Sequence, residues 1–303
     1  MRKLLIGMTC YGSYVDTFFD YCLPSLMAQG NLPTLCKHFE VGFVIHTDKE
    51  SAPRFKELKA ALFHDITDGD KYEMTGKHQN HDLTLAKILG ADYHLCMPDF
   101  IYSENCFAGV IKAIERGHKA IARLVVSTVK EDITPELNRP RSAIDLATLS
   151  LQHMHPGIQN WRATKDGYYP NTHVLAWETK DRLRMCSPHM TPVYIANEAI
   201  DACSNYPLDS ILDIVVAGDI YLPQPEDDMV IIEISPRDGR KPEETRVDLK
   251  EFNRIFQWDT RSSKKQLQLF QQETVDAIRG SGEWNDVEIS EQKAIVRHAL
   301  ENG

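Results

Sequence analysis

Residues 77–107 read KHQNHDLTLAKILGADYHLCMPDFIYSENCF, and this stretch decides the fold. Apolar residues recur at helical spacing and predict a helix over 82–89. Gly90 ends that helix, because glycine readily adopts the left-handed conformation of a C-terminal cap. Residues 91–97 then read as a strand that Pro98 and Asp99 interrupt. Ligands of open α/β sheets bind outside the carboxyl ends of strands, so Asp99 is the first candidate for contact with a metal or a phosphate.

Strands and helices alternate around this stretch through residues 1–126. Short apolar runs predict strands at 3–8, 40–47, 91–97 and 120–126. Amphipathic patterns predict helices at 14–29, 53–63, 82–89 and 103–116, with a polar loop at 65–76. This alternation is typical of an α/β fold whose mostly parallel central sheet carries helices on both faces.

The second half of the chain is less regular. It predicts a helix at 142–151, strands at 173–177, 191–195, 211–217 and 229–234, and a short helix or turn at 181–185. The aromatic, irregular part around Trp161, Tyr168 and Tyr169 is of the kind that usually carries function. Helices at 249–258 and 264–278 predict a C-terminal helical arm. The expected organisation is one domain in two halves, 1–126 and 127–236, followed by an extension over 237–303.

Composition excludes several classes of protein. The 303 residues carry a net charge of −10, which argues against a nucleic-acid partner because such binding needs a basic face. The seven cysteines include no CxxC pair, which indicates reduced core residues rather than a disulfide or zinc framework. The apolar run at the start is too short for a signal peptide, and no run is long enough for a transmembrane segment. We therefore expect a cytoplasmic protein.

Three side chains are candidates for ligand chemistry. The Asp99 carboxylate suits Mg²⁺ or Mn²⁺, which would in turn hold a diphosphate; the alternative is a turn-capping Asp. Asp48 ends a predicted strand and could accept hydrogen bonds from a base or a ribose, or could cap a helix. His173 could complete a divalent-metal site from a distance, or could be a polar residue with a structural partner. The chain lacks GxGxxG, Walker, GxSxG and HExxH motifs, which argues against dinucleotide-binding dehydrogenases, P-loop enzymes, α/β-hydrolases and zincins.

Residues 4–126 resemble the nucleotide-binding half of GT-A-fold glycosyltransferases, closest to the inverting family 2 pattern and to uncharacterised bacterial members. In that pattern a first strand leads into a polar loop, and a second strand ends in an acidic residue. A helix of the form N-x-x-x-A-x-x-x-G-A-x-Y then runs into a metal-binding DxD, as residues 81–99 do here. Met97 stands at the first Asp of that DxD, so that only Asp99 remains.

The resemblance implies transfer of a sugar from a nucleotide-sugar donor, with a UDP-sugar favoured, to a glycan, peptide or lipid-linked acceptor. The implied cofactor is Mg²⁺ or Mn²⁺, bound by Asp99 with help from His173. The general base would be a carboxylate of the second half. By position, the residues that bind the donor nucleotide and its metal are Thr9, Cys10, Tyr11, Asp48 and Asp99, and the candidate bases are Glu178, Asp209 and Asp228.

Two other functions stay open. A non-catalytic GT-A-like protein that binds a nucleotide or a partner would explain Met97. A nucleotidyltransferase shares the α/β layout, but it would carry a basic, glycine-rich phosphate loop after the first strand, and residues 9–13 contain no Lys or Arg. The sequence names neither donor sugar nor acceptor, and it leaves a homodimer open.

Overall fold

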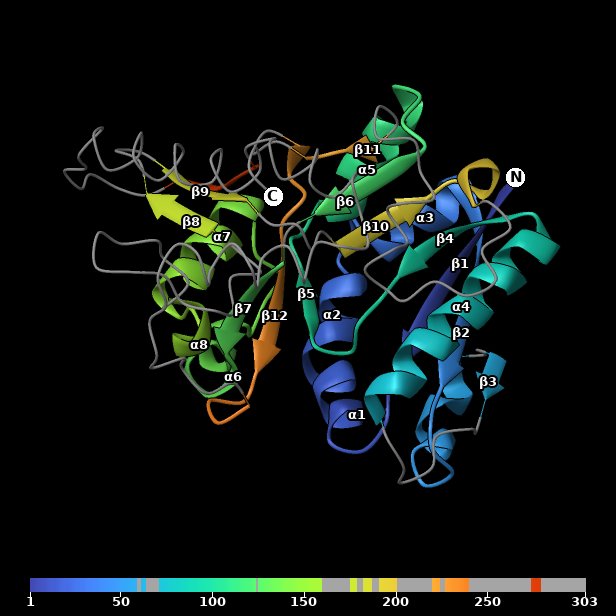
Figure 1. Ribbon diagram of the computed structural model, residues 1–303, viewed down its shortest axis with the longest axis horizontal. Helices are drawn as coiled ribbons and strands as arrows, with labels where there is room; N and C mark the ends of the chain where they lie inside the picture. The colour runs from blue at the N-terminus through green and yellow to red at the C-terminus, as the bar shows by residue number, and fades with distance from the viewer. Residues whose placement is uncertain are drawn as a thin grey trace, which may run out of the picture.

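The computed structural model describes residues 1–58, 61–63, 71–123, 125–159, 175–178, 182–186, 191–200, 220–223, 227–239 and 274–278. These residues form a mixed α/β structure with one seven-stranded sheet and two three-stranded sheets (Figure 1). His173 and Asp209, with the strand expected at 211–217 and the helix expected at 249–258, lie outside the described residues.

The central sheet has the strand order β3-β2-β1-β4-β10-β6-β11. Strands β3, β2, β1 and β4 run parallel, β10 runs antiparallel to β4 and β6, and β11 is parallel to β6. Among the described strands of this sheet only β10 is therefore reversed, and the predicted mostly parallel sheet is confirmed. The strands of this sheet are β1 (Arg2–Thr9), β2 (Phe39–His46), β3 (Ala61–Phe63), β4 (Ala91–Leu95), β6 (Ala120–Arg123), β10 (Thr191–Ile195) and β11 (Ile220–Tyr221).

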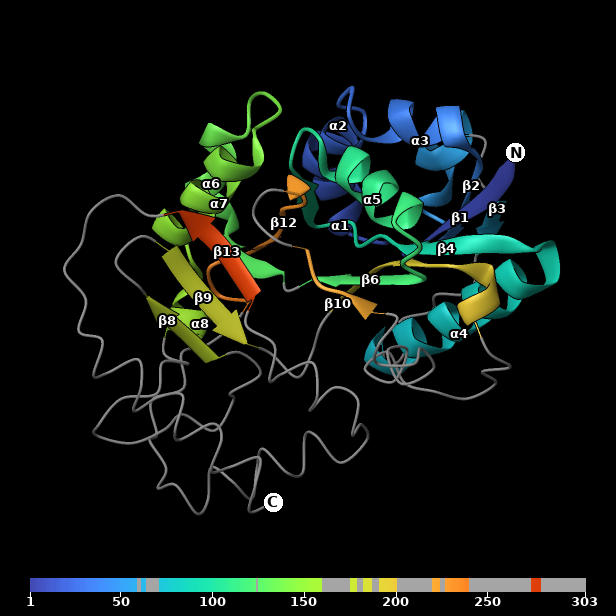
Figure 2. The same cartoon turned by 90° about the horizontal axis from the view of Figure 1, so that it is seen from above.

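Helices cover both faces of the sheet, as expected (Figure 2). One face carries α1 (Tyr14–Thr17), α2 (Leu23–Leu26), α3 (Leu32–His38) and α5 (Cys106–Glu115). The other face carries α4 (Lys71–Leu89). Strand β1 is buried on both sides: Ile6 and Met8 pack in the core under the first group of helices, and Leu5 packs in the core that includes Leu83 of α4. Such two-sided burial explains why the strand reads as a continuous apolar run.

The helix predicted at 14–29 is interrupted. A π-helical turn, Phe18–Cys22, separates α1 from α2. Pro24 is the second residue of α2, directly after this π-helical turn. Helix α3, which the sequence did not predict, begins after Asn31, and Pro33 stands at its start.

The helix predicted at 53–63 is wrong in its second part. A 3₁₀ helix, Ala52–Leu58, is followed by β3, whose Ala61 pairs with Val44 of β2. A short apolar run fits a strand as well as a helix, and pairing with the edge of the sheet decides between them. The loop predicted at 65–76 is also too long, because α4 begins at Lys71.

A second sheet stands beside the central one, with the order β5-β12-β7. The single strand predicted at 120–126 is in fact β6 and β7, which belong to different sheets. Ser142 caps α7 by accepting a hydrogen bond from the Asp145 N–H at 3.2 Å, and α7 packs against β7 and β12. The elements of this part are β5 (Phe100–Tyr102), β7 (Val126–Val129), α6 (Lys130–Ile133), a 3₁₀ turn (Thr134–Glu136), α7 (Ala143–Gln152), α8 (Pro156–Gln159), a 3₁₀ turn (Asn197–Ala199) and β12 (Ile231–Ser235).

A third, antiparallel sheet has the order β13-β9-β8. Its strands are β8 (Leu175–Glu178), β9 (Arg182–Cys186) and β13 (Thr274–Ile278). Two predictions fail here: the short helix or turn at 181–185 is strand β9, and the end of the helix predicted at 264–278 is strand β13. The expected C-terminal arm is therefore not helical at 274–278, because pairing with β9 outweighs local helical periodicity.

Candidate functional site

Three strand ends meet at one edge of the central sheet. Thr9, the last residue of β1, pairs with His46, the last residue of β2. Beyond the strands, the Cys10 N–H donates to the His46 carbonyl at 2.9 Å, and the Cys96 N–H donates to the Gly7 carbonyl at 3.0 Å. The loops after β1, β2 and β4 therefore lie together. The chain winds one way from β1 to β3 and the other way from β1 to β4, so this edge is the topological switch point where ligands of such sheets bind.

Asp48 joins the loop after β1 to the loop after β2. Gly12 has a φ of +55°, which favours glycine, and its N–H donates to Asp48 Oδ2 at 3.2 Å. The Ser51 N–H donates to Asp48 Oδ1 at 2.7 Å. Burial by itself would raise the pKa of Asp48, but the hydrogen bonds from Ser51 and Gly12 outweigh it and lower the pKa. Asp48 is thus an ionised carboxylate that is held between the loops at the carboxyl edge of the sheet.

Asp99 follows β4 in a turn closed by a hydrogen bond from the Phe100 N–H to the Met97 carbonyl at 3.1 Å. Its side chain is 7% exposed, and its carbonyl accepts a hydrogen bond from the Ile234 N–H at 2.9 Å, which ties the turn to β12. Burial chiefly raises the pKa of the Cys10 thiol, and the nearby Cys96, Asp99 and Asp48 raise it further. Asp99 follows Cys96 by three residues, and Cys96 is hydrogen-bonded to the β1 backbone at Gly7, so Asp99 and Cys10 both lie beyond the carboxyl ends of neighbouring strands.

Thr9 and Tyr11 occupy different positions in the same loop. The Thr9 hydroxyl is within 3.3 Å of His78 Nδ1, so it lies under α4. Tyr11 is half-buried, and its ring packs edge-on against Tyr14 with centroids 6.4 Å apart. Burial raises the pKa of the Tyr11 hydroxyl, which keeps it a neutral hydrogen-bonding group.

The ligand atoms around Asp99 decide whether a divalent cation can bind there. Mg²⁺ is commonly bound through one or two carboxylates, with substrate phosphates and waters completing its shell, so a single Asp99 fits that mode. Among the described residues, one cluster of His, Cys, Asp and Glu side chains could hold a metal by itself, and Asp99 is not part of it; its members are His46, His81 and Asp82.

The candidate bases are not gathered at this edge as far as the structure describes them. Glu178 is the last residue of β8, in the third sheet. Asp228, with a φ of +58°, precedes β12, and its carbonyl accepts a hydrogen bond from the Ser103 hydroxyl at 2.6 Å. Because β12 runs antiparallel to β5, Asp228 lies beyond the end where Ile231 pairs with Tyr102, whereas Asp99 lies at the Ile234 end.

Glu233 is a carboxylate near Asp99 that the sequence did not single out. It pairs with Phe100, the neighbour of Asp99, and its Oε1 accepts hydrogen bonds from Ser235 at 2.6 Å and Ser127 at 3.4 Å. The sequence does mark this residue, because Glu233 interrupts the apolar run MVIIEI. A charged residue inside such a strand is uncommon without a partner.

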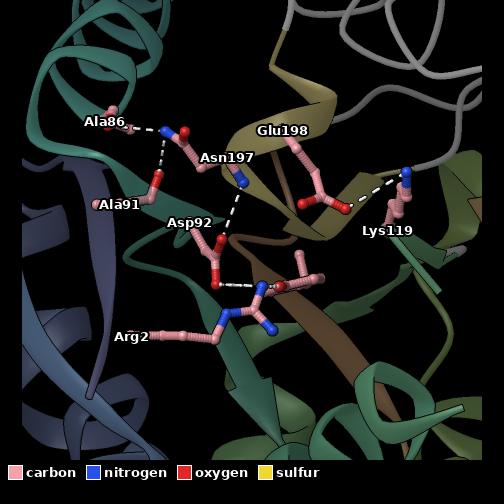
Figure 3. Close-up of polar contacts among 8 residues, drawn as sticks. Arg2, Ala86, Ala91, Asp92, Lys119, Asn197 and Glu198 are labelled. Atoms are coloured by element: carbon pink, nitrogen blue, oxygen red, sulfur yellow. Dashed lines mark hydrogen bonds and ion pairs between the residues drawn. The ribbon is translucent and has the colours of Figure 1, made fainter. Parts of the chain in front are cut away.

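A cavity of about 440 Å³ opens at the opposite, amino edge of the sheet. Two ion pairs lie in its lining: Arg2 pairs with Asp92 at 2.9 Å, and Lys119 pairs with Glu198 at 3.4 Å (Figure 3). Asn197 donates to Asp92 through its backbone N–H at 2.8 Å and ties β10 to the α4–β4 turn. The carboxyl edge is the stronger candidate for a ligand site, because its strand ends and ionised Asp48 match the position of ligand sites in this class of sheet.

No family model and no curated protein matches the chain. S. aureus TarS is similar at 15% identity and a TM-score of 0.31, over 41% of this chain and 22% of that one. S. aureus TarS 1–349 in complex with UDP is similar at 13% identity and a TM-score of 0.33, over 98% of this chain and 69% of that one. A Bacillus anthracis protein named as a glucose-1-phosphate thymidylyltransferase, in complex with a sucrose, is similar at 13% identity and a TM-score of 0.25, over 42% and 55%.

The chain thus spans about a fifth of the length of the first of these structures. At TM-scores this low, the likeness supports no conclusion about the function of this chain. Within the described part of the chain, no helix combines the length and the apolar character that crossing a membrane requires.

Proposed function

We propose that this protein is a glycosyltransferase that moves a sugar from a nucleotide-sugar donor, a UDP-sugar by preference, to an acceptor hydroxyl. The observation that supports it best is the meeting of the loop 9–12, Asp48 and Asp99 at the switch point of a mostly parallel sheet. The motif likeness of residues 81–99 to GT-A glycosyltransferases adds the substrate class.

In this proposal the nucleoside lies over the loop that follows β1. Tyr11 forms the wall of its site, and the backbone of Thr9 and Cys10 forms the floor, because the Thr9 hydroxyl lies under α4 and Cys10 is buried. Asp48 keeps its negative charge through the Gly12 and Ser51 hydrogen bonds and accepts hydrogen bonds from the base or ribose. These bonds fix the carboxylate before the ligand arrives, which lowers the entropy cost of binding.

The reaction is a displacement at the anomeric carbon of the donor. The acceptor oxygen forms a bond to that carbon, the bond to the diphosphate oxygen breaks, and the diphosphate leaves with the electron pair. A carboxylate takes the proton of the acceptor hydroxyl. A Mg²⁺ or Mn²⁺ ion bound by Asp99, with His173 as a further ligand, would offset the charge that develops on the leaving diphosphate.

The proposed base is one of Glu178, Asp209 and Asp228. Glu233 joins them, because its strand is hydrogen-bonded to Asp99. A glycan, a peptide or a lipid-linked group is the proposed acceptor, and a homodimer stays open. Five cysteines described by the structure are free thiols, four of them buried, which fits the reducing cytoplasm of a bacterial cell.

A non-catalytic nucleotide-binding protein is the second candidate, favoured by Met97 at the first position of the metal motif. A nucleotidyltransferase ranks third, since the loop after β1 has no cationic side chain. Turnover of a donor sugar separates the first candidate from the second.

The test is a thermal-shift panel of UDP, GDP, CDP and ADP, each with and without Mn²⁺. A ligand that binds the native state at 100 times its dissociation constant stabilises it by about 2.7 kcal/mol. We expect UDP with Mn²⁺ to raise the unfolding midpoint most, and Asp99→Asn to abolish the dependence on Mn²⁺. Asp145→Asn, an exposed carboxylate on α7, is the matched control and should respond like wild type. If no nucleotide raises the midpoint, the proposal fails.

A further inference from the structure

The buried face of α4 is polar where it crosses the ends of β1 and β2. His78, Gln79 and Asp82 are almost completely buried there, although Gln and Asp usually lie at the surface. Buried ionisable groups carry a desolvation cost, so they persist where partners or a bound ion compensate for it. This polar interior needs a physical explanation beyond core packing.

Three of the side chains converge on one point. His46 Nε2 lies 2.8 Å from Asp82 Oδ1, and His81 Nδ1 lies 3.5 Å from the same oxygen. The three ligand atoms all lie within 4.8 Å of one another. Around a zinc ion with bonds of about 2.0–2.2 Å, tetrahedral ligand atoms lie about 3.3–3.6 Å apart, so small side-chain adjustments suffice to close a site.

The surrounding residues hold this cluster in place. The His46 ring stacks on the His78 ring with centroids 4.1 Å apart and planes 3° apart. His78 is in turn within hydrogen-bonding distance of the Thr9 hydroxyl, at 3.3 Å. Outer contacts of this kind fix the orientation of ligating imidazoles in metal sites.

The Asp82 carboxylate packs closely against the backbone of β1 at Gly7. A Cβ at Gly7 would overlap Asp82 Oδ2 and would lie 2.8 Å from the Tyr93 hydroxyl, so both oxygens pack against this one backbone position. The Tyr93 hydroxyl is fully buried and has no hydrogen-bond partner among the residues that the structure describes. An orphaned buried hydroxyl beside a buried carboxylate is a further sign of a site built for a bound species.

We propose that His46, His81 and Asp82 form a binding site for a first-row transition-metal dication, Zn²⁺ by preference. Two imidazoles and one carboxylate suit zinc, whereas Mg²⁺ prefers oxygen ligands alone. Three protein ligands leave a coordination position open, and His81 is 46% exposed, which gives the ion a path from solvent. The bound ion would fasten the end of β2 to α4. This site is separate from the cation proposed at Asp99.

The test uses untagged full-length protein freed of metal by a chelator. Zn²⁺ binding is followed by calorimetry, and Co²⁺ binding by its visible absorption, which reports nitrogen and oxygen ligation directly. We expect one equivalent to bind, the unfolding midpoint to rise with Zn²⁺ but not with Mg²⁺, and His81→Ala to weaken binding at least about 10-fold. His81 is half-exposed, so this variant should still fold.

Two matched variants complete the experiment. His38→Ala removes an exposed histidine at the end of α3 and should bind Zn²⁺ like wild type. Asp99→Asn should also keep full Zn²⁺ affinity, so loss of the nucleotide site would not be confused with loss of this one. The proposal is overturned if no metal binds, or if wild type and His81→Ala bind Zn²⁺ with equal affinity.

Discussion

Gly7→Ala should destabilise the protein although it adds only one methyl group. The new Cβ would lie 2.8 Å from Cε2 and Oη of Tyr93, about 0.6 Å inside ordinary contact at 3.4 Å, and closer still to Asp82 Oδ2. Tyr93 and Asp82 are 0% and 1% exposed, so neither side chain can move out into solvent. The strain must fall on the core between β1 and α4.

The magnitude follows from two costs and one gain. Overpacking a core costs about 1–3 kcal/mol. Displacing Asp82 from His46 loses a charge-assisted hydrogen bond of about 1.5–3 kcal/mol. Alanine regains about 0.5–1 kcal/mol over glycine in a strand. The net loss should be about 1.5–5.5 kcal/mol, or roughly 3–22 °C in the unfolding midpoint at about 2–4 °C per kcal/mol.

Urea unfolding of Gly7→Ala and Gly42→Ala measures this effect. Gly42 lies in β2 opposite Leu5, and a Cβ there would meet only Leu5 Cδ1 at 4.0 Å. Gly42→Ala should therefore change stability by no more than about 1 kcal/mol, in the stabilising direction. Equal unfolding midpoints for the two variants would refute the close approach of Asp82 to the β1 backbone.

Three further predictions concern other parts of the fold. The pKa of Asp48 is lowered from 3.8 in the native state, so its carboxylate stabilises that state above pH 3.8. In thermal unfolding, wild type should therefore be more stable than Asp48→Asn, and this difference should shrink as the pH falls below about 3.8. Ser142→Ala should cost about 1 kcal/mol in urea unfolding because α7 loses its cap. Thr148→Ala, at a half-buried position away from the cap of the same helix, should change stability by about 0.5 kcal/mol or less. Asp92→Ala should cost about 2–4 kcal/mol because it leaves buried donors unsatisfied, whereas Arg2→Ala, at a half-exposed position, should cost about 1 kcal/mol or less in the same assay.

The middle of the central sheet, β2-β1-β4, could be predicted from the sequence because these strands are largely buried. Such strands read as continuous apolar runs, and β1, β2 and β4 were expected within one or two residues of their observed ends. The start of α4 was missed for the opposite reason. Its buried face holds His78, Gln79 and Asp82, so the helix shows no apolar periodicity there.

The candidate site was only partly visible for the same kind of reason. Asp48 and Asp99 stand at strand ends, which sequence patterns mark well. The cluster of His46, His81 and Asp82 joins the end of β2 to α4, and Glu233 reaches the neighbourhood of Asp99 through β5–β12 pairing. Contacts between distant segments are set by packing and register, and no local pattern records them.

The most direct test of the central claim is a crystal structure with UDP and Mn²⁺, with the Mn²⁺ located by its anomalous scattering. The account predicts the nucleoside over residues 9–12 beside Asp48, and the Mn²⁺ at Asp99 next to the diphosphate. A nucleotide in the cavity at the amino edge of the sheet, or a structure with no nucleotide at the carboxyl edge under saturating UDP, would contradict it.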